Sequence, residues 1–551
     1  MNAIFEAQVL IVGAGPVGLT LAMDLAQRGI QVLMAETRHR GEPPNVKCNH
    51  VSARSMEIFR RLGVVSALRN TGLPAEYTND VAYRTRFTGE ELSRIPIPSR
   101  QDRYTTTGGP DTWWPTPEPP HRINQIFLEP VLFAHAEATN GVRILNRTRI
   151  DDYTQDEHGV TAHGVNIDTG DSISIRCQYL IGCDGGKSGV RKNMGAKLSG
   201  TDVVGRVQST YIRAPGLLGM QQSAPAWCTF SINPIRSGNV YAIDGRQTWL
   251  LHNYLNANEL DFDSIDRDWA IRQILGVGPD FQYEILSKED WVGRRLVADK
   301  FRDRRVYICG DAAHLWFPMA GYGMNAGIAD ALNLSWQLAA YLNGWGGSGL
   351  LDGYEAERLP ITEQVSNFAM NHAYAMQKKR EQVPSHLEED SEQGAQARVR
   401  IGREMYDLNV QQYCCAGLNF GYYYDQSPMI SYDGTLHPGY TMDQFTASTV
   451  PGCRTPHVWL QGRRSLYDVM GSGFTLLRLN PSLDTSALEQ AAQLRGVPLV
   501  VLDLPADLAG EAYTHPLVLS RPDQHVAWRG HALPTDSEAL IDQVRGVPVS
   551  S

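Results

Sequence analysis

The feature that most constrains the fold is a glycine-rich turn that joins a buried strand to a helix. Residues 7–12 form an almost continuous apolar run, which is typical of a strand covered on both faces. Gly-Ala-Gly-Pro-Val-Gly follows at once at residues 13–18, and residues 19–27 have the composition of a helix. A second apolar run, residues 31–35, ends at Glu36. The pattern predicts a βαβ unit at the start of a parallel sheet.

Each part of this unit has a physical role. Gly13 permits the tight turn, Gly15 lets the backbone approach a pyrophosphate, and Gly18 allows close packing of helix on strand. The helix N-terminus directs free N–H groups toward the phosphates. Glu36 is placed to accept hydrogen bonds from a ribose 2′-hydroxyl, and its charge disfavours a 2′-phosphate. The unit predicts dinucleotide binding and does not by itself distinguish FAD from NAD.

Length, charge and cysteine spacing narrow the class of protein. A chain of 551 residues predicts two or three domains. The formal net charge of -10 argues against a general nucleic-acid or anionic-membrane surface. Eight cysteines without a CxxC pair predict neither a disulfide scaffold nor a metal site. No apolar stretch approaches the roughly 20 residues of a membrane span, so we expect a cytoplasmic protein.

Two later motifs repeat the pattern of a buried strand followed by Gly and Asp. Residues 179–191 run from an apolar strand through Asp184 into a helix start. Residues 305–314 contain a second such strand, which ends at Gly310 and Asp311. The chain then passes through a turn into another helix, and that turn contains Pro318, Gly321, Gly323, Met324 and Asn325.

With these motifs the sequence resembles the group A flavoprotein monooxygenases, the aromatic-ring hydroxylases typified by para-hydroxybenzoate hydroxylase and phenol hydroxylase. The resemblance runs in order from about residue 7 to residue 370 and includes residues 54–63, 125–132 and 350–358. It implies an FAD enzyme that takes electrons from NADPH or NADH. With O2, such an enzyme hydroxylates a small aromatic, phenolic or polycyclic polyketide-type substrate through a flavin C4a-hydroperoxide.

The resemblance also assigns roles to individual residues. Asp311 would hold a ribityl hydroxyl of FAD, and the turn from Gly321 to Asn325 would direct N–H groups at the flavin edge where reduction places negative charge. Asp184 would serve the FAD and nicotinamide side of the cleft. Arg54 and Gln125 resemble further FAD contacts.

The implied fold class is α/β: a Rossmann-like FAD-binding domain, an interleaved mixed β-sheet substrate domain and a C-terminal thioredoxin-like domain. The expected boundaries are 1–80, 100–195 and 295–370 for FAD binding, 81–99 and 196–294 for substrate binding, 371–430 for a helical connection, and 431–551 for the thioredoxin-like domain. Without CxxC the last domain cannot exchange dithiols, and packing or assembly is its expected role.

Strand-like alternation between residues 210 and 252 points alternate side chains at a pocket. Trp227, Tyr241, Trp249 and His252 are the candidates, with Tyr241 and His252 as candidate catalytic groups.

The identity of the general base stays open. Phenol hydroxylases carry an Asp five residues before the Arg that corresponds to Arg54, and this chain has Asn49 there. Asn cannot accept a proton, so His50, with an ordinary pKa of about 6.5, is the candidate base.

Several expectations remain for the rest of the chain. The runs Lys378-Lys379-Arg380 and Glu388-Glu389-Asp390 are interpreted as solvated charge. A homodimer is compatible with the sequence. Two alternative functions remain open: a Baeyer–Villiger or ring-rearranging flavin oxygenase acting on a polyketide, and a flavin-binding module without catalysis.

Overall fold

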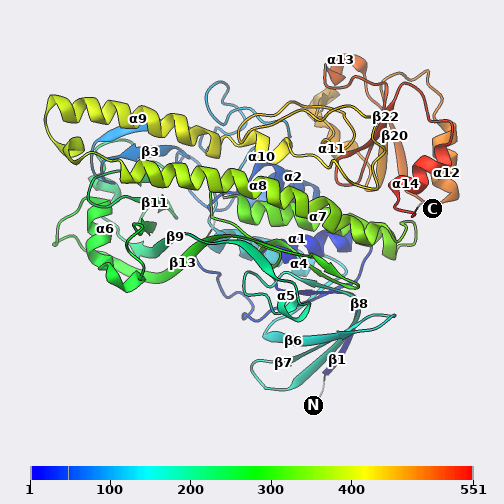
Figure 1. The fold of residues 1–551 in the computed structure, drawn as a ribbon, viewed down its shortest axis with the longest axis horizontal. Helices are drawn as coiled ribbons and strands as arrows, with labels where there is room; N and C mark the ends of the chain where they lie inside the picture. Colours follow the sequence, from blue (N-terminus) through cyan, green and yellow to red (C-terminus); the bar gives the residue numbers. More distant parts are fainter. Residues whose placement is uncertain (1–2, 48, 320, 549–551) are drawn as a thin grey trace.

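The computed structural model describes residues 3–47, 49–319 and 321–548, which contain two eight-stranded sheets, a four-stranded sheet and a two-stranded ribbon (Figure 1). The α/β class expected from the sequence is confirmed. The chain enters the first sheet more than once, because segments of the second sheet are inserted between its strands.

The first sheet has a parallel centre in the order β15-β8-β1-β2-β5, with antiparallel strands at its margins. Its strands are β1 (Ala3–Val12), β2 (Val32–Ala35), β5 (Val142–Leu145), β6 (Thr148–Gln155), β7 (Val160–Asn166), β8 (Ser172–Gly182), β14 (Arg302–Asp303) and β15 (Val306–Ile308). The apolar run that predicted the first strand lies in β1, whose residues 9–12 are buried, and the structure extends the strand back to Ala3.

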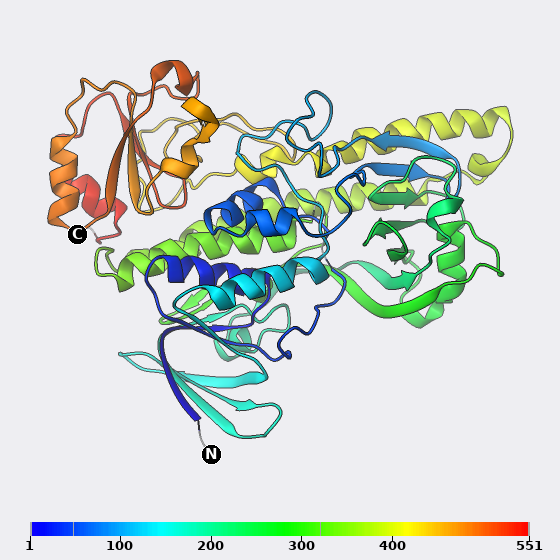
Figure 2. The same cartoon turned by 180° about the vertical axis from the view of Figure 1, so that it is seen from behind.

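Helices α1 and α4 pack side by side over this sheet, with α7 against α1 (Figure 2). The helices of this part are α1 (Pro16–Gln27), α2 (Ala53–Arg61), α3 (Val65–Arg69), α4 (Gln125–Ala138), α5 (Gly189–Asn193) and α7 (Tyr322–Leu342). Helix α7 is apolar or buried along most of its length, which is expected of a helix enclosed on several sides.

The second sheet has the order β16-β13-β9-β12-β11-β10-β3-β4 and is antiparallel except for the β10–β3 pair. Its strands are β3 (Val81–Arg84), β4 (Glu91–Ile95), β9 (Leu198–Arg213), β10 (Cys228–Ser231), β11 (Gly238–Ala242), β12 (Thr248–Tyr254), β13 (Glu284–Ala298) and β16 (His314–Leu315), and α6 (Arg267–Leu275) packs near β12. One face carries the apolar cluster that contains Phe87 and Trp249.

A single long helix, α8 (Leu350–Glu381), crosses the molecule from the C-terminal part to the second sheet (Figure 1). The expected boundary between residues 370 and 371 therefore falls inside a continuous helix. Helix α9 (Glu392–Tyr413) returns along β4, and the short α10 (Ala416–Phe420) follows it.

The C-terminal part is built on a four-stranded sheet in the order β20-β19-β21-β22. Its elements are β17 (Trp459–Leu460), β18 (Arg464–Ser465), α11 (Leu466–Val469), β19 (Phe474–Arg478), α12 (Ser486–Leu494), β20 (Leu499–Asp503), α13 (Ala506–Ala509), β21 (Leu517–Ser520), β22 (Val526–Gly530) and α14 (Ser537–Val544). The turn after β21 carries Arg521, which is fully buried and donates two hydrogen bonds to Glu357 of α8, at 2.5 and 2.8 Å.

The glycine turn after β1 is packed too closely for side chains at two positions. Gly13 has φ +103°, and a Cβ there would lie 2.4 Å from the carbonyl oxygen of Cys183. A Cβ on Gly18 would lie 2.1 Å from the carbonyl oxygen of Gly13. A Cβ on Gly15 would meet nothing within 4 Å, because this glycine faces open space.

We predict that alanine destabilises the protein at Gly18 but not at Gly15. Gly18→Ala forces α1 away from the turn and costs about 1–3 kcal/mol of stability, as overpacking generally does. Gly15→Ala meets no protein atom and leaves stability nearly unchanged. Thermal unfolding of the two variants without added ligand measures the difference, and equal melting temperatures would contradict the packing argument.

Candidate active site

The carboxyl ends of three parallel strands meet at one edge of the first sheet. The N–H of Cys183, just after β8, donates to Val12 of β1 at 2.8 Å, and the N–H of Cys309, just after β15, donates to Gly182 of β8 at 2.9 Å. The residues that follow each strand therefore lie side by side. In open α/β sheets, ligands bind at this edge.

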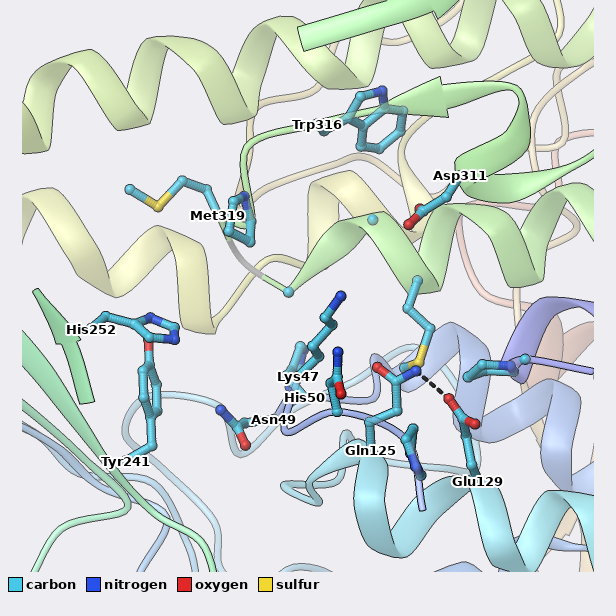
Figure 3. A pocket seen from close by; sticks show the side chains of 18 of the residues that line it. Lys47, Asn49, His50, Gln125, Glu129, Tyr241, His252, Asp311, Trp316 and Met319 are labelled. Atoms are coloured by element: carbon cyan, nitrogen blue, oxygen red, sulfur yellow. Dashed lines mark hydrogen bonds between the residues drawn. The ribbon is translucent and has the colours of Figure 1, made fainter. Parts of the chain in front are cut away.

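A cavity of about 600 Å³ opens at this edge and extends to the second sheet (Figure 3). Gln125, Glu129 and Asp311 lie toward one side of it, Tyr241 and His252 lie on the other, and Asn49 and His50 lie between them (Figure 3). The nucleotide edge and the substrate-facing sheet thus share one cavity.

Near the glycine turn, Glu36 holds the backbone in place. Its carboxylate accepts from the Ala14 N–H at 2.7 Å and from Arg38 Nε at 3.2 Å. Burial opposes ionisation, but these hydrogen bonds outweigh it and lower the pKa of Glu36. The Arg38 guanidinium also donates to one carboxylate oxygen of Glu129 at 2.7 Å, and Gln125 donates to the other. A smaller cavity of about 190 Å³ lies beside Glu36 and Arg38.

Asp311 lies in the short 3-10 turn Gly310–Ala312 that follows β15, with its carboxylate open to the cavity. Asp311 is exposed to the cavity, yet desolvation by the surrounding protein raises its pKa, although His314 and Lys47 act in the opposite direction. A carboxylate in this state gains by accepting hydroxyl hydrogen bonds from a ligand.

The turn before α7 contributes backbone to the same cavity. Pro318, Gly321, Gly323 and Met324 line it. Asn325 is instead buried beneath the turn, where its side chain accepts from the Ser52 N–H at 2.9 Å and donates to the Gly321 carbonyl at 2.6 Å. These two hydrogen bonds of Asn325 stabilise the turn.

Two expected FAD contacts do not reach the cavity. Arg54 is buried and donates to Gln524 at 2.9 Å and to the Asp523 carbonyl at 3.0 Å, so the C-terminal part engages its guanidinium. Asp184 accepts from the Val190 N–H at 3.1 Å at the start of α5, while its neighbours Cys183 and Gly185 line the cavity. Tertiary packing explains the position of Arg54, and a local hydrogen bond at the start of α5 explains that of Asp184.

The second sheet presents an aromatic wall to the cavity. Trp227, Tyr241 and His252 line it together with Tyr254 and Tyr413. Trp249, the remaining sequence candidate, points to the opposite face and is fully buried in the core. Alternation along β12 explains this difference, since residues 249 and 252 lie on opposite faces.

The electrostatics of the candidate bases differ from the expectation. His50 is buried, and burial together with the cations of Arg122 and Arg103 holds its pKa well below 6.5, with Arg122 Nη1 in contact with His50 Nδ1. Burial and Arg380 lower the pKa of His252 to about 4. Burial raises the pKa of Tyr241 well above its usual value, so this phenol stays protonated. The ordinary pKa assumed for His50 was wrong.

Several lining residues were not identified from the sequence. Arg122 lies three residues before the helix that starts at Gln125, and Arg380 belongs to the run interpreted as solvated. Both line the cavity, as do Arg38, Lys47 and Tyr413. Only the position of Arg122 beside a recognised motif offered a signal.

A Rossmann-type sheet with a cavity at its carboxyl edge is typical of dinucleotide-binding proteins. Family models agree: residues 6–369 match the FAD binding domain, and residues 448–548 match the aromatic-ring hydroxylase C-terminal model. The chain belongs to the FAD-dependent aromatic-ring hydroxylases, which are flavin-dependent monooxygenases.

Individual relatives align along nearly the whole chain. A phenol 2-monooxygenase of a Pseudomonas species is 29% identical and covers 100% of this chain and 94% of its own. A putative polyketide hydroxylase of Streptomyces halstedii is 30% identical and covers 99% and 97%. The structure of the rebeccamycin biosynthetic enzyme RebC with reduced flavin superimposes with a TM-score of 0.89 at 32% identity and covers 99% and 100%.

No helix within the described part of the chain has the length and apolarity needed to cross a membrane. The described residues also contain no group of three or more His, Cys, Asp or Glu side chains arranged to hold a metal ion.

We predict that His252 contributes to acid lability. Its pKa is about 4 in the folded protein and about 6.5 when unfolded, so the unfolded chain binds more protons between these values. The stabilisation is present above pH 6.5 and is lost as pH falls toward 4, by about 2 kcal/mol at pH 5.

Thermal unfolding at pH 7.5 and pH 5.0 tests this. The destabilisation between the two pH values should be smaller in His252→Gln than in the original protein. His158→Gln, a substitution in an exposed turn, is the control and should change nothing. An equal loss in His252→Gln would show that His252 does not carry the effect.

Proposed function

We propose that this enzyme uses reduced nicotinamide and O2 to hydroxylate the ring of a phenolic substrate, and that the substrate is larger than a single ring. The observation that carries the proposal is one cavity of about 600 Å³ with a nucleotide edge at one end and an aromatic wall at the other. We further propose that the first sheet holds FAD and the second sheet holds the substrate.

The residues present fit FAD. Gly15 leaves open space beside the helix N-terminus for a pyrophosphate, and Asp311 offers an incompletely solvated carboxylate to the ribityl hydroxyls. Glu36 faces the smaller cavity, where a ribose would lie; Arg38 lines both cavities, and Gln125 lines the larger one. When bound and reduced, FAD supplies the activation of O2 for transfer of one oxygen atom.

The wall of the second sheet would bind the substrate. Trp227 and Tyr241 lie edge to face at 5.6 Å, as do Tyr241 and His252 at 5.3 Å, so their rings form a continuous apolar surface. Such a surface binds a flat ring system and excludes water from the reacting face. The names of two relatives, phenol 2-monooxygenase and putative polyketide hydroxylase, support a phenolic substrate and a multi-ring substrate respectively.

The proton of the substrate hydroxyl requires an acceptor other than the three candidates. His50 and His252 are both held neutral with depressed pKa values, and Tyr241 keeps its proton. We propose that these groups position the substrate: the Tyr241 hydroxyl accepts from Asn239 at 3.3 Å and remains able to donate. A substrate that binds as an anion needs no base.

We predict that Asp311→Asn lowers FAD affinity while the protein stays folded. Loss of a charged acceptor costs about 1.5–3 kcal/mol, which corresponds to roughly a ten-fold to hundred-fold weaker Kd. Titration of the flavin-free protein with FAD measures it, and the exposed Asp202→Asn serves as control. Wild-type affinity in Asp311→Asn would remove the role assigned to Asp311.

We predict that phenols of two or more rings stimulate NADPH or NADH oxidation and give products heavier by one oxygen atom. Mass spectrometry and NMR of the product separate ring hydroxylation from insertion beside a ketone, which would favour the Baeyer–Villiger alternative. Absence of stimulated turnover with every phenol and ketone would favour a flavin-binding module.

A further inference from the structure

The last turn of α8 brings one cation into the substrate end of the cavity. Of the basic run at residues 378–380, Lys378 is exposed and Lys379 pairs with Glu404 of α9 at 2.7 Å. Arg380 instead points inward and lines the cavity with Tyr241, His252 and Tyr254. The interpretation of this run as solvated charge was therefore wrong for Arg380.

Arg380 lacks the partners that a buried guanidinium needs. Its Nε and Nη2 atoms are buried and have no hydrogen-bond acceptor within the described part of the chain, and the described carboxylates include none within 4.0 Å of it. One face of the guanidinium is covered by the Tyr254 ring, 3.7 Å away. The cation–π contact occupies this face, and Nε and Nη2 remain without an acceptor among the described residues.

This arrangement is costly without a ligand. Burial lowers the pKa of Arg380, which means that the surroundings disfavour its charge. A buried, unpaired charge generally destabilises a protein by more than a neutral residue of the same size would. An anion bound in the cavity would supply the hydrogen-bond acceptor and the negative charge that the protein side chains do not provide.

The other charged side chains of the cavity also place positive charge at the aromatic wall and negative charge at the nucleotide edge. A second cation, Arg122, lies at the other side of the aromatic wall, over Trp227 at 4.6 Å, with Asp111 behind it at 3.8 Å. The carboxylates that line the cavity, Glu42, Glu129 and Asp311, are shared with the nucleotide edge. The aromatic wall is therefore bracketed by cations.

We propose that Arg380 is a substrate-binding residue that receives an anionic oxygen of the aromatic substrate, either a carboxylate or a phenol ionised on binding. The proposal rests on the proposed function and specifies its substrate class as anionic polycyclic phenols. The planar guanidinium of Arg380 donates hydrogen bonds to the substrate oxygen, while the ring system of the substrate lies against Tyr241 and Trp227. An ionised phenol at this position has released its proton to bulk water on binding, so neither His50 nor His252 needs to accept it.

Paired probes test the proposal on the FAD-loaded enzyme. 3-Hydroxy-2-naphthoate is compared with 3-hydroxy-2-naphthamide, and 2-naphthol with 2-methoxynaphthalene, by titrating changes in the bound flavin absorbance. The anionic or ionisable member of at least one pair should bind about ten-fold more tightly or better, as expected for charged hydrogen bonds. The first pair reports a carboxylate, and the second reports an ionised phenol.

Variants test whether Arg380 causes the preference for the anionic or ionisable probe. Arg380→Gln should reduce it to less than about two-fold, Arg380→Lys should restore part of it because it keeps the charge without the fork, and Lys378→Gln should leave it intact. Equal binding within both pairs, failure of both ionisable probes to bind, or a preference that survives in Arg380→Gln would each overturn the proposal.

Binding is measured separately from turnover, so the two proposals fail differently. A preference lost in Arg380→Gln together with no hydroxylated product would leave the anion site standing and reject the hydroxylase function. Hydroxylation of the ionisable probes by the original enzyme and by Arg380→Gln with equal KM would retain the function and reject the anion site.

Discussion

The close contact between the first glycine turn and the end of β8 is the constraint on which the site depends. Gly13 approaches the Cys183 carbonyl so closely that no side chain fits, and Gly18 lets α1 pack onto the same turn. The helix N-terminus, Glu36 and Asp311 therefore come to one edge of the sheet. Parallel strands end together, so residues far apart in the chain, such as Gly13 and Asp311, reach a single ligand.

The C-terminal part is tied to this core by buried ions. Arg521 and Glu357 are both fully buried, and Arg358 in the next position of α8 pairs with Asp330 of α7 at 2.7 Å. Buried pairs of this kind are weak evidence for stability, because desolvation offsets their attraction, but breaking one partner is strongly destabilising. Their consequence here is positional: they hold the first half of α8, whose far end carries Arg380 to the substrate wall.

The charge distribution in the cavity explains why the search for a general base among its histidines fails. Burial, together with the cations near His50 and His252, disfavours a positive charge on either ring, so both rings stay neutral. The same cations favour negative charge on a bound ligand. Burial and the cations both make these histidines poor bases, whereas for a bound phenol the cations favour ionisation and burial opposes it.

Local patterns in the sequence determined the βαβ unit with its glycine turn, the Gly-Asp motifs and the α/β class, because each depends on contacts between neighbours or on strand periodicity. Gly13, Gly15, Glu36 and Asp311 were identified for that reason. Only the tertiary structure decided that Arg54 serves the C-terminal part, that Trp249 lies in the core, and that Arg380 leaves a surface-like charge run to line the cavity. Burial and charge at these positions come from segments distant in the chain, such as residues 523–524 against Arg54, and no local pattern encodes them.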